Sequence, residues 1–519
     1  MSVLPRLSWL GALLGVALVS SCGGGTPEPA GGSQNVILIT LDTTRADFLG
    51  AWGRPGNPTP HMDALADDGV RFANAVSTSA VTPVSHASIL TGRTPYDHGL
   101  RVLAGAGGFR LPESVPTFAT TLKARGYATA AIHSAFPVSS IYGFDRGFDL
   151  FEEVVPDSGG LDPKEDGSVG WDVGSGQRRS DATTDRVLTF LEGTQEPFFL
   201  WIHYWDPHDN RFFPPDEFVD GRMPLDVNGI PTTPDGQLRW DSETYGLEIS
   251  YVDAQFGRVV RALKDDGRYD TTIIGIVADH GEGMEDGFAK HGWGAHRILY
   301  QEQIHVPLLL RIPGANSGKT VERLVSSVDL FPTVLDYLDV APDGAISGRS
   351  LRPMIDGDPA AAASVYAYAD QINLWDANAK MLERRPKADF LHVLMDDEWK
   401  LIYRPRAPKT SELYAYRTDR DEQQNLFGKR ADVSRRLLLE LASRDAWVLS
   451  PPKDDNGGMT EEQLQALGNL GYTAGGVAMS AEEIAKMWRW LCPETWHFLP
   501  DPGPCPEHGS PTLPARRPN

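Results

Sequence analysis

Basic residues are in short supply in this chain of 519 residues. It contains 48 Lys and Arg against 70 Asp and Glu, which gives a formal net charge of −22. The summed field of such a surface repels polyanions, so the composition disfavours nucleic-acid binding. Any anionic substrate must therefore be attracted by a bound metal or by a local basic pocket.

Long apolar runs are scarce as well. The first stretch has a single basic residue, Arg6, followed by an apolar run over residues 7–19. This run is far shorter than the roughly 20 residues that a membrane-spanning helix requires. We therefore predict a signal peptide at residues 1–21 rather than a membrane span.

Cysteine is rare, with three copies in the chain. The first, Cys22, follows Ser20 and Ser21 and resembles the bacterial lipobox, at which lipoproteins are cleaved and acylated. An ordinary signal peptide beside a stray thiol is the alternative. Residues 22–34 are rich in Gly and Pro and are predicted to form a flexible tether. The protein is thus expected to be exported and lipid-anchored to the membrane of the bacterial cell envelope, at its periplasmic or outer-membrane face.

The other two cysteines, Cys492 and Cys505, lie in a tail at residues 476–519 that is rich in Pro and Trp. An exported chain meets oxidising conditions, which permit a short-loop disulfide between them. Two tail thiols without a link are the alternative, and the sequence leaves both open.

The pattern of apolar runs predicts an α/β fold. Short, nearly continuous apolar runs are typical of strands that are buried on both faces of a sheet. Amphipathic stretches at 114–125 and 245–265 lie between these runs, which indicates a large, mostly parallel sheet sandwiched by helices. The predicted strands are at 35–41, 127–132, 197–202, 272–277 and 306–311.

The character of the chain changes near residue 347. Shorter candidate strands at 364–369, 390–394 and 399–403 precede a candidate helix at 433–446, which is typical of a smaller α+β subdomain. We therefore place the main α/β domain at 35–346 and a C-terminal subdomain at 347–475. Two stretches, 159–179 and 216–237, are predicted to be surface excursions.

Side chains that can bind a metal follow three of the predicted strands. Asp42 follows the first strand, Asp206 and His208 follow the third, and Asp279 and His280 follow the fourth. In doubly wound sheets, ligands bind just beyond the carboxyl ends of the strands, so these groups are expected to converge. Asp and His together suit Zn²⁺ or Mn²⁺, whereas Ca²⁺ prefers oxygen ligands alone. A lone Asp at a strand end is often a helix cap or turn former, but three converging ends favour a site.

A further segment, at residues 81–93, reads VTPVSHASILTGR and leads from a small-polar loop into an apolar helix start. A helix N-terminus at this place would present backbone N–H groups to an anion. Ordinary N-capping by Thr82 or Ser85 is the alternative.

Several segments resemble, in order and spacing, the sulfatase branch of the alkaline-phosphatase-like superfamily. They are NVILITLDTTRADFLG, SHASILTGRTPYDHG, FLWIHYWDPH, ADHGEG, KHGWGAHRILYQEQIHVPLLLRIPG and SSVDLFPTVLDYL. The resemblance extends over about residues 35–470, because SELYAYRTDRDEQQNL is similar to a C-terminal segment of the family. Each motif alone is weak, but their order is specific. The resemblance implies a metallohydrolase that cleaves sulfate or phosphate esters.

Three departures from the family pattern bear on the mechanism. Typical sulfatases oxidise the Cys or Ser of a Cys/Ser-x-Pro-x-Arg motif to formylglycine, whereas the matching residue here is Thr82, which cannot form that aldehyde. The arrangement instead resembles the Thr nucleophile of related phosphodiesterases, with His86 four residues later. Thr43 replaces a metal-binding Asp, and His296 replaces a sulfate-binding Lys. A Thr ester must be hydrolysed by an incoming water, which favours phosphoryl chemistry.

By this resemblance the chain binds one or two divalent ions, with Zn, Mn or Ca as the expected metal. Two ions roughly 4 Å apart can hold both the attacking and the leaving oxygen of an in-line displacement. The ligands expected for the first ion are Asp42, Thr82, Asp279 and His280. The ligands expected for the second ion are Asp206, His208 and His291.

The remaining candidate residues are expected to act on the substrate. Thr82 is the predicted nucleophile, and His86 and Arg45 are candidate donors. Arg45 is equally well a salt-bridge partner of Asp47. His296 is expected to bind the substrate anion or a metal.

The leading hypothesis is therefore a sulfatase-like hydrolase whose substrate is a sulfated or phosphorylated small molecule or glycan. A phosphodiesterase, or a transferase of phospho-head-groups at the cell surface, is an alternative within the enzymes. A protein that binds such glycans without turnover belongs to a different class, and the metal ligands Asp42 and Asp279 argue against it. The sequence indicates no oligomeric state.

Overall fold

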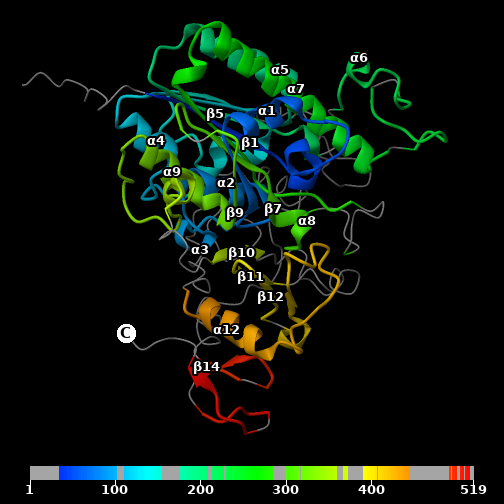
Figure 1. Cartoon of the computed structure of the whole chain (residues 1–519), viewed down its shortest axis with the longest axis vertical. Coiled ribbons are helices and arrows are strands. Elements are labelled where there is room, and N and C mark those ends of the chain that lie inside the picture. Colours follow the sequence, from blue (N-terminus) through cyan, green and yellow to red (C-terminus); the bar gives the residue numbers. More distant parts are fainter. Residues whose placement is uncertain are drawn as a thin grey trace, which may run out of the picture.

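The protein is described by a computed structural model, in which a large sheet with its helices, a small sheet and a short C-terminal unit follow one another along the long axis (Figure 1). The described residues are 34–101, 110–154, 176–208, 213–226, 229–237, 239–284, 291, 296, 298–315, 317–358, 366–371, 390–405, 407–444, 490–492, 494–499, 503–507 and 509–514. The predicted signal peptide, Cys22 and nearly all of the tether lie outside them, as does most of the excursion at 159–179.

A nine-stranded sheet has the order β4-β3-β5-β1-β6-β8-β2-β7, with β9 paired to β2. The pairs of β1 with β5 and β6, and of β3 with β4 and β5, are parallel. Every residue of β1, β5 and β6 is buried, as their apolar sequences require. The strands are β1 (Asn35–Leu41), β2 (Val70–Val76), β3 (Ala128–His133), β4 (Leu150–Glu152), β5 (Phe198–Tyr204), β6 (Thr272–Ala278), β7 (His305–Val306), β8 (Leu308–Arg311) and β9 (Lys319–Ser326). The predicted α/β class with a large, mostly parallel sheet is confirmed.

The strand predicted at 306–311 differs from expectation. Pro307 divides it into β7 and β8, because proline lacks the N–H group that a strand interior needs for its ladder. β8 also runs antiparallel to its neighbours β6 and β2. The large sheet is therefore mixed on this side.

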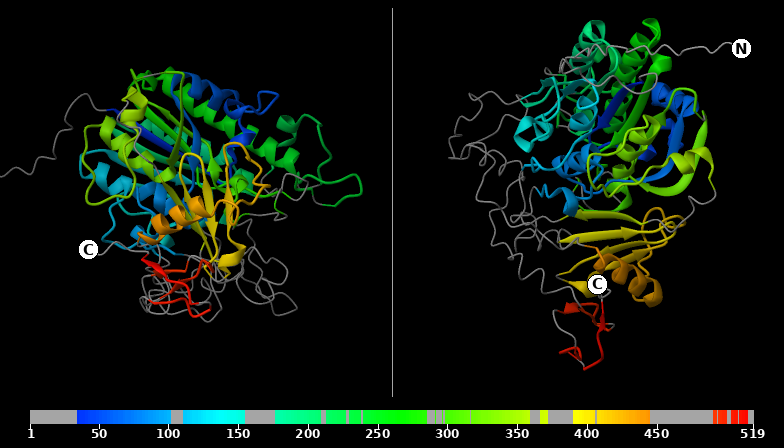
Figure 2. Two further views of the ribbon diagram at one scale, coloured as in Figure 1. Left: turned by 60° about the horizontal axis from the view of Figure 1, so that its bottom comes forward. Right: turned by 90° about the vertical axis from the view of Figure 1, so that its left-hand side faces the viewer.

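Helices cover both faces of the large sheet (Figure 2). Phe198 and Phe199 on β5 show this, since consecutive strand residues point to opposite faces. The Phe198 ring contacts Phe190 of α5, whereas the Phe199 ring stacks on Phe118 of α4. The main helices are α1 (Pro60–Asp68), α2 (Thr82–Thr91), α4 (Phe118–Lys123), α5 (Ser180–Gly193), α7 (Ser242–Asp265) and α9 (Leu330–Tyr337), and the shorter ones are α3 (Pro95–His98), α6 (Asp216–Val219), α8 (Gln301–Ile304) and α10 (Arg352–Asp356).

Capping residues explain why two helices begin at other residues than the sequence predicts. α7 begins at Ser242, before the expected residue 245, because the Asp241 side chain accepts the backbone N–H groups of Glu243 and Thr244. α4 begins only at Phe118, because Thr117 forms a capping box with Thr120. Within the described part of the chain, no helix is long and apolar enough to cross a membrane.

A smaller antiparallel sheet with the order β10-β11-β12-β13 follows, as the predicted α+β subdomain requires. Its elements are β10 (Ala367–Gln371), β11 (Leu391–Met395), β12 (Lys400–Tyr403), β13 (Glu412–Tyr414) and α12 (Ala431–Ala442), and the C-terminal unit adds β14 (Trp490–Leu491), β15 (Phe498–Leu499) and β16 (Leu513–Pro514). The small sheet lies between the large sheet and this unit in the right-hand view of Figure 2. The exact domain boundaries stay predictions.

Buried polar contacts join the subdomain to the main domain. Lys400 of β12 lies 2.7 Å from Glu422, and both side chains are fully buried. Glu422 also accepts the backbone N–H of Gln301, the first residue of α8, at 2.7 Å. Arg101 pairs with Asp370 of β10 in the same manner. The Glu422 contact fixes the subdomain beside α8, and the Arg101 contact fixes it beside the segment that follows α3.

Candidate active site

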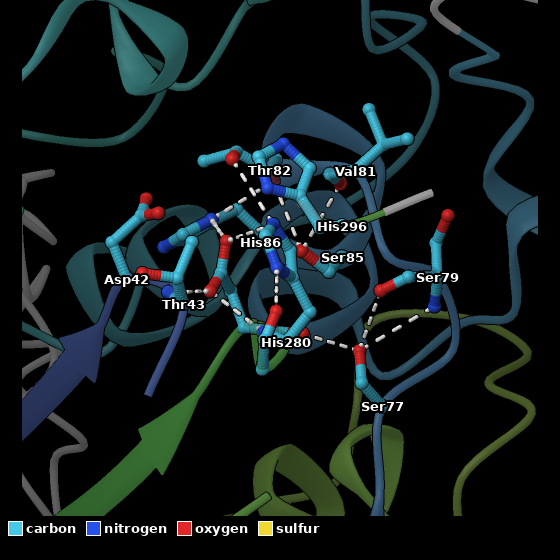
Figure 3. A network of polar contacts seen from close by, with 12 residues as sticks. Asp42, Thr43, Ser77, Ser79, Val81, Thr82, Ser85, His86, His280 and His296 are labelled. Atoms are coloured by element: carbon cyan, nitrogen blue, oxygen red, sulfur yellow. Dashed lines mark hydrogen bonds and ion pairs between the residues drawn. The ribbon is translucent and has the colours of Figure 1, made fainter. Parts of the chain in front are cut away.

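The carboxyl ends of β1 and β6 bring together the core of the predicted site. The two strands pair in parallel with Leu41 opposite Ala278, so the residues that follow them leave the same edge of the sheet. Asp42, Asp279 and His280 each offer a ligand atom within 4.8 Å of the others, and all three are buried. Figure 3 shows Asp42 and His280 at these strand ends, facing the first turn of α2.

The electrostatics of this cluster favour a bound cation. Burial raises the pKa of Asp42 well above its usual value, and the nearby carboxylates of Asp279 and Glu282 raise it further. Burial also raises the pKa of Asp279. Asp42 Oδ1 has no hydrogen-bond partner among the described residues. A divalent ion would relieve this repulsion and occupy the vacant lone pairs, so the residues present fit a metal.

Thr82 is the first residue of α2, and its hydroxyl faces the cluster. Its Oγ1 lies 3.3 Å from Nε2 of His280. Nδ1 of His280 lies 3.0 Å from the carbonyl oxygen of Gly281. Because a carbonyl can only accept, we assign the ring proton to Nδ1, which leaves the lone pair of Nε2 for a metal or for the hydroxyl.

Ser85 and His86 are one turn further along α2. The Ser85 hydroxyl donates to the backbone carbonyls of Val81 and Thr82, at 3.2 and 3.1 Å, and so is engaged within its own helix. Nδ1 of His86 lies 2.9 Å from the Thr82 carbonyl, whereas Nε2 has no partner among the described residues. Burial lowers the pKa of His86 to about 3, so the ring is neutral near pH 7.

His203 also belongs to the site, although the sequence analysis assigned it no role. It lies near the end of β5, opposite Thr40 of β1, and its Nε2 is 3.2 Å from Oδ2 of Asp42. Nδ1 faces the backbone N–H of Ser134 at 3.5 Å, so Nδ1 accepts and Nε2 donates to Asp42. His203 therefore holds one oxygen of Asp42 and leaves the other for a metal. A polar residue within an otherwise apolar strand was the signal in the sequence.

Thr43 orients the cluster through its backbone. Its N–H donates to Oδ1 of Asp279 at 3.0 Å, and its Oγ1 donates to the carbonyl of Pro207 at 2.8 Å. Its φ of 46° lies in the left-handed region, which a β-branched residue rarely adopts. This conformation aims the N–H at Asp279, and the side chain points away from the cluster.

Two of the three residues expected to bind a second ion, Asp206 and His291, contact groups outside the cluster. Oδ1 of Asp206 accepts the backbone N–H and the hydroxyl of Ser180, at 3.0 and 2.6 Å, where α5 begins. Burial raises the pKa of Asp206 to about 7. His291 lies 2.7 Å from Glu302 and stacks on Tyr300 at 3.5 Å between ring centroids. The assignment of a second ion stays a prediction, because the metal-binding group found among the described residues contains none of the three.

His296 and His208 extend the cluster along the sheet edge. Nδ1 of His296 lies 3.2 Å from Oε2 of Glu282, and its ring centroid is 4.7 Å from that of His280. The ring of His208 is 5.2 Å from that of His296 and stacks on Trp205. The His296 imidazole thus lies against the cluster, where it is a candidate donor to a bound anion.

Arg45 forms an ion pair with Asp47, which was the alternative to a role as a donor to substrate. Its guanidinium contacts both carboxylate oxygens of Asp47, at 2.9 and 2.7 Å. Nη1 also lies 3.3 Å from the carbonyl oxygen of Glu282. Arg45 thus supports the segment after β6, and its role as a donor to substrate stays a prediction.

Two models of known protein families match this chain. A model of the sulfatase family matches residues 34–340, and a model described as N-sulphoglucosamine sulphohydrolase, C-terminal, matches residues 289–445. The N-acetylglucosamine-6-O-sulfatase of Bacteroides thetaiotaomicron is 25% identical over 76% of this chain and 83% of its own length. The multifunctional alkaline phosphatase superfamily protein PehA of Trinickia caryophylli is 26% identical over 80% of this chain and 95% of its own length.

Solved structures share the fold. The phosphonate monoester hydrolase of Agrobacterium radiobacter superposes with a TM-score of 0.58 at 23% identity, over 78% of this chain and 93% of that chain. A protein in complex with its substrate D-glucosamine-2-N,6-O-disulfate superposes with a TM-score of 0.61 at 22% identity, over 79% of this chain and 97% of that chain. At 23% and 22% identity, these superpositions show a shared fold alone.

Proposed function

Because this chain belongs to the sulfatase family, we propose that it is a metal-dependent hydrolase of sulfate or phosphate esters with Thr82 as its nucleophile. The observation that carries the proposal is the position of the Thr82 hydroxyl. Its Oγ1 is 3.3 Å from Nε2 of His280, at the edge of the buried Asp42, Asp279 and His280 cluster. Similarity to several named sulfatases supports ester hydrolysis.

In this proposal Asp42, Asp279 and His280 hold one divalent ion, either Zn, Mn or Ca. Bound there, the ion would supply positive charge that favours the alkoxide form of a neighbouring hydroxyl. His203 orients Asp42 through its hydrogen bond, and Thr43 orients Asp279 through its backbone N–H. The ligands are therefore held in place before substrate binds.

The reaction then proceeds in two displacements. The Thr82 oxygen forms a bond to the sulfur or phosphorus atom, and the bond from that atom to the alcohol of the substrate breaks. An incoming water then cleaves the Thr82 ester and releases sulfate or phosphate. In this proposal the backbone N–H of Thr82 and the imidazole of His296 donate to the anion, because Pro83 has no N–H group and the N–H of Val84 already donates to the Val81 carbonyl. Thr82 stands where sulfatases carry the precursor of formylglycine, and we propose that it stays a threonine.

The proposed substrate is a sulfated or phosphorylated small molecule or glycan. The relative that acts on N-acetylglucosamine 6-O-sulfate and the fold neighbour bound to a disulfated glucosamine support a sulfated sugar. A formylglycine hydrate releases sulfate by returning to the aldehyde, whereas an ester of Thr82 must be hydrolysed by water. Thr82 therefore favours a second candidate function, the cleavage of a phosphomonoester or phosphodiester. We also propose that the protein is exported and lipid-anchored through Cys22.

Metal analysis of the purified protein, combined with assays on an aryl sulfate, an aryl phosphate and an aryl phosphodiester, tests the proposal. We expect bound divalent metal, turnover of at least one ester and loss of turnover with chelator. A metal-loaded protein that binds these esters and cleaves none would contradict the proposal and favour a non-catalytic binder. A mass spectrum with an aldehyde at Thr82 would contradict the assignment of the nucleophile.

A further inference from the structure

The C-terminal unit is a small structure at the far end of the molecule from the candidate active site (Figures 1 and 2). Its sheet, of order β15-β14-β16, pairs strands that are each only two residues long. The unit packs on the subdomain through Trp496, whose ring lies 5.1 Å from that of Phe427. The Tyr403 hydroxyl also donates to the Trp496 carbonyl at 3.0 Å.

Cysteines occupy the interior of this unit. Cys492 is 0% exposed and Cys505 is 3% exposed, and Leu491 and Thr495 are buried beside them in sequence. Structures below about 40 residues bury too little apolar surface for stability and usually need disulfides, metals or a partner. The strands here contribute few ladder hydrogen bonds, so the stability of the unit depends on what its buried sulfur atoms do.

Both sulfur atoms lie against the same residue. The backbone N–H of Thr495 donates to Sγ of Cys492 at 3.3 Å, and Oγ1 of Thr495 is 4.0 Å from Sγ of Cys505. Each cysteine also begins a tight turn, since Trp496 N–H donates to the Cys492 carbonyl and Gly509 N–H to the Cys505 carbonyl. Thr495 thus lies between the two turns and contacts the sulfur atom of each.

The environment of Cys492 favours its thiolate. Burial raises the pKa of this thiol, but hydrogen bonds from Thr495, the Glu494 backbone and the Cys505 side chain outweigh burial and lower the pKa to about 7. A thiol with a pKa near the ambient pH attacks disulfides efficiently. Among the described residues, neither cysteine belongs to a group that could hold a metal ion.

We propose that Cys492 and Cys505 form a disulfide in the mature protein, which closes the C-terminal unit. While the unit folds and both sulfur atoms are still accessible, the Cys492 thiolate attacks an external disulfide and releases one thiolate. Cys505 then attacks the mixed disulfide and releases the second. The two cysteines lose two protons and two electrons in total, and the external disulfide is reduced to two thiols. The oxidant is a disulfide of the compartment to which we propose the chain is exported, so formation in the cell depends on that proposal.

Peptide mapping without reductant tests the link. The full-length protein is denatured with an alkylating agent and digested, and we expect one linked pair of peptides that contains Cys492 and Cys505 and separates on reduction. If the protein is recovered with both thiols reduced, it is unfolded and incubated with oxidised glutathione while it refolds, because the folded unit buries both sulfur atoms. A disulfide formed only at that step supports the pairing of the two cysteines and contradicts their oxidation in the cell, on which the proposal of export bears. Alkylated Cys492 and Cys505 after that incubation, or glutathione adducts alone, would overturn the disulfide.

Serine variants provide a second measurement. Cys492→Ser, Cys505→Ser and the double variant should each be cleaved several-fold faster in the tail by a protease. The three rates should be equal, because each variant loses the same single link. Glu507→Gln, an exposed change near Cys505, is the matched control and should behave as wild type. Equal cleavage of oxidised and reduced wild-type protein would also overturn the proposal.

Discussion

At the residue scale, two hydroxyls in the first turn of α2 differ in what they contact. Thr82 Oγ1 faces Nε2 of His280, whereas the hydroxyl of Ser85 donates to carbonyls of its own helix. We predict that Thr82→Ala lowers kcat at least ~10³-fold with metal still bound, because the attacking atom is lost. Thr82→Ser should retain part of the activity. Steady-state kinetics and metal content measure both.

Ser85→Ala is the control for this pair and should change kcat little. A phosphoryl or sulfuryl adduct trapped on a peptide and located by mass spectrometry identifies the nucleophile directly. An adduct on Ser85, or an undiminished kcat in Thr82→Ala, would show that the assignment is wrong.

His203 is a second single residue with a testable role, because it donates a hydrogen bond to Asp42. We predict that His203→Gln weakens metal binding by ~10–100-fold, as is typical when a partner of a metal ligand is removed. Titration calorimetry of the metal-free protein measures this change. His392→Gln replaces another buried histidine, which lies in β11, and should leave the metal dissociation constant unchanged. Equal constants in His203→Gln and wild type would contradict the role of His203.

At the element scale, a buried carboxylate joins two helices on one face of the large sheet. Asp253 of α7 accepts the backbone N–H groups of Met62 and His61 at the start of α1, at 2.7 and 3.1 Å. Burial raises the pKa of Asp253 to about 7, although these hydrogen bonds oppose the shift. The charged form is therefore costly in the folded protein.

The direction of the pH effect follows from this raised pKa. Above its unfolded pKa of about 4, Asp253 holds in the folded state a proton that the unfolded chain has lost. Its contribution to the free energy of unfolding is thus complete below about pH 4 and is lost as pH rises through about 7. We predict that Asp253→Asn reduces the loss of stability between pH 5 and pH 8 by up to about 3 kcal/mol. Urea unfolding at both pH values measures it, and identical pH slopes in the two proteins would refute it.

At the scale of the whole molecule, the net charge of −22 makes electrostatic attraction to an anionic membrane surface unfavourable. A covalent lipid would supply the attachment instead. We predict that Cys22→Ser abolishes membrane association and leaves the exported protein soluble. Cell fractionation with mass analysis of the N-terminal peptide measures this, and Ser21→Ala is the matched control. Wild-type protein that is exported, soluble and unmodified at Cys22 would contradict the prediction.

Parts of the fold and site were predictable because their causes are local. The apolar runs of β1, β5 and β6 require burial on both faces, and parallel pairing places the residues after them at one edge. Asp42, Asp279 and His280 were expected to meet for this reason. The direction of β8 was not predictable, because a short apolar run has the same composition in either direction.

Periodicity and motif order are properties of the chain, so the α/β architecture, the similarity to sulfatases and the residue types of the cluster at Asp42 were predictable. Which side chains share an environment became clear only from the folded chain. It assigned His203 to Asp42, and it placed His291 on Glu302 at the junction with the subdomain. These pairings join residues from different strands and loops. They depend on the register of β1 with β5 and on the docking of the second sheet, which no local pattern specifies.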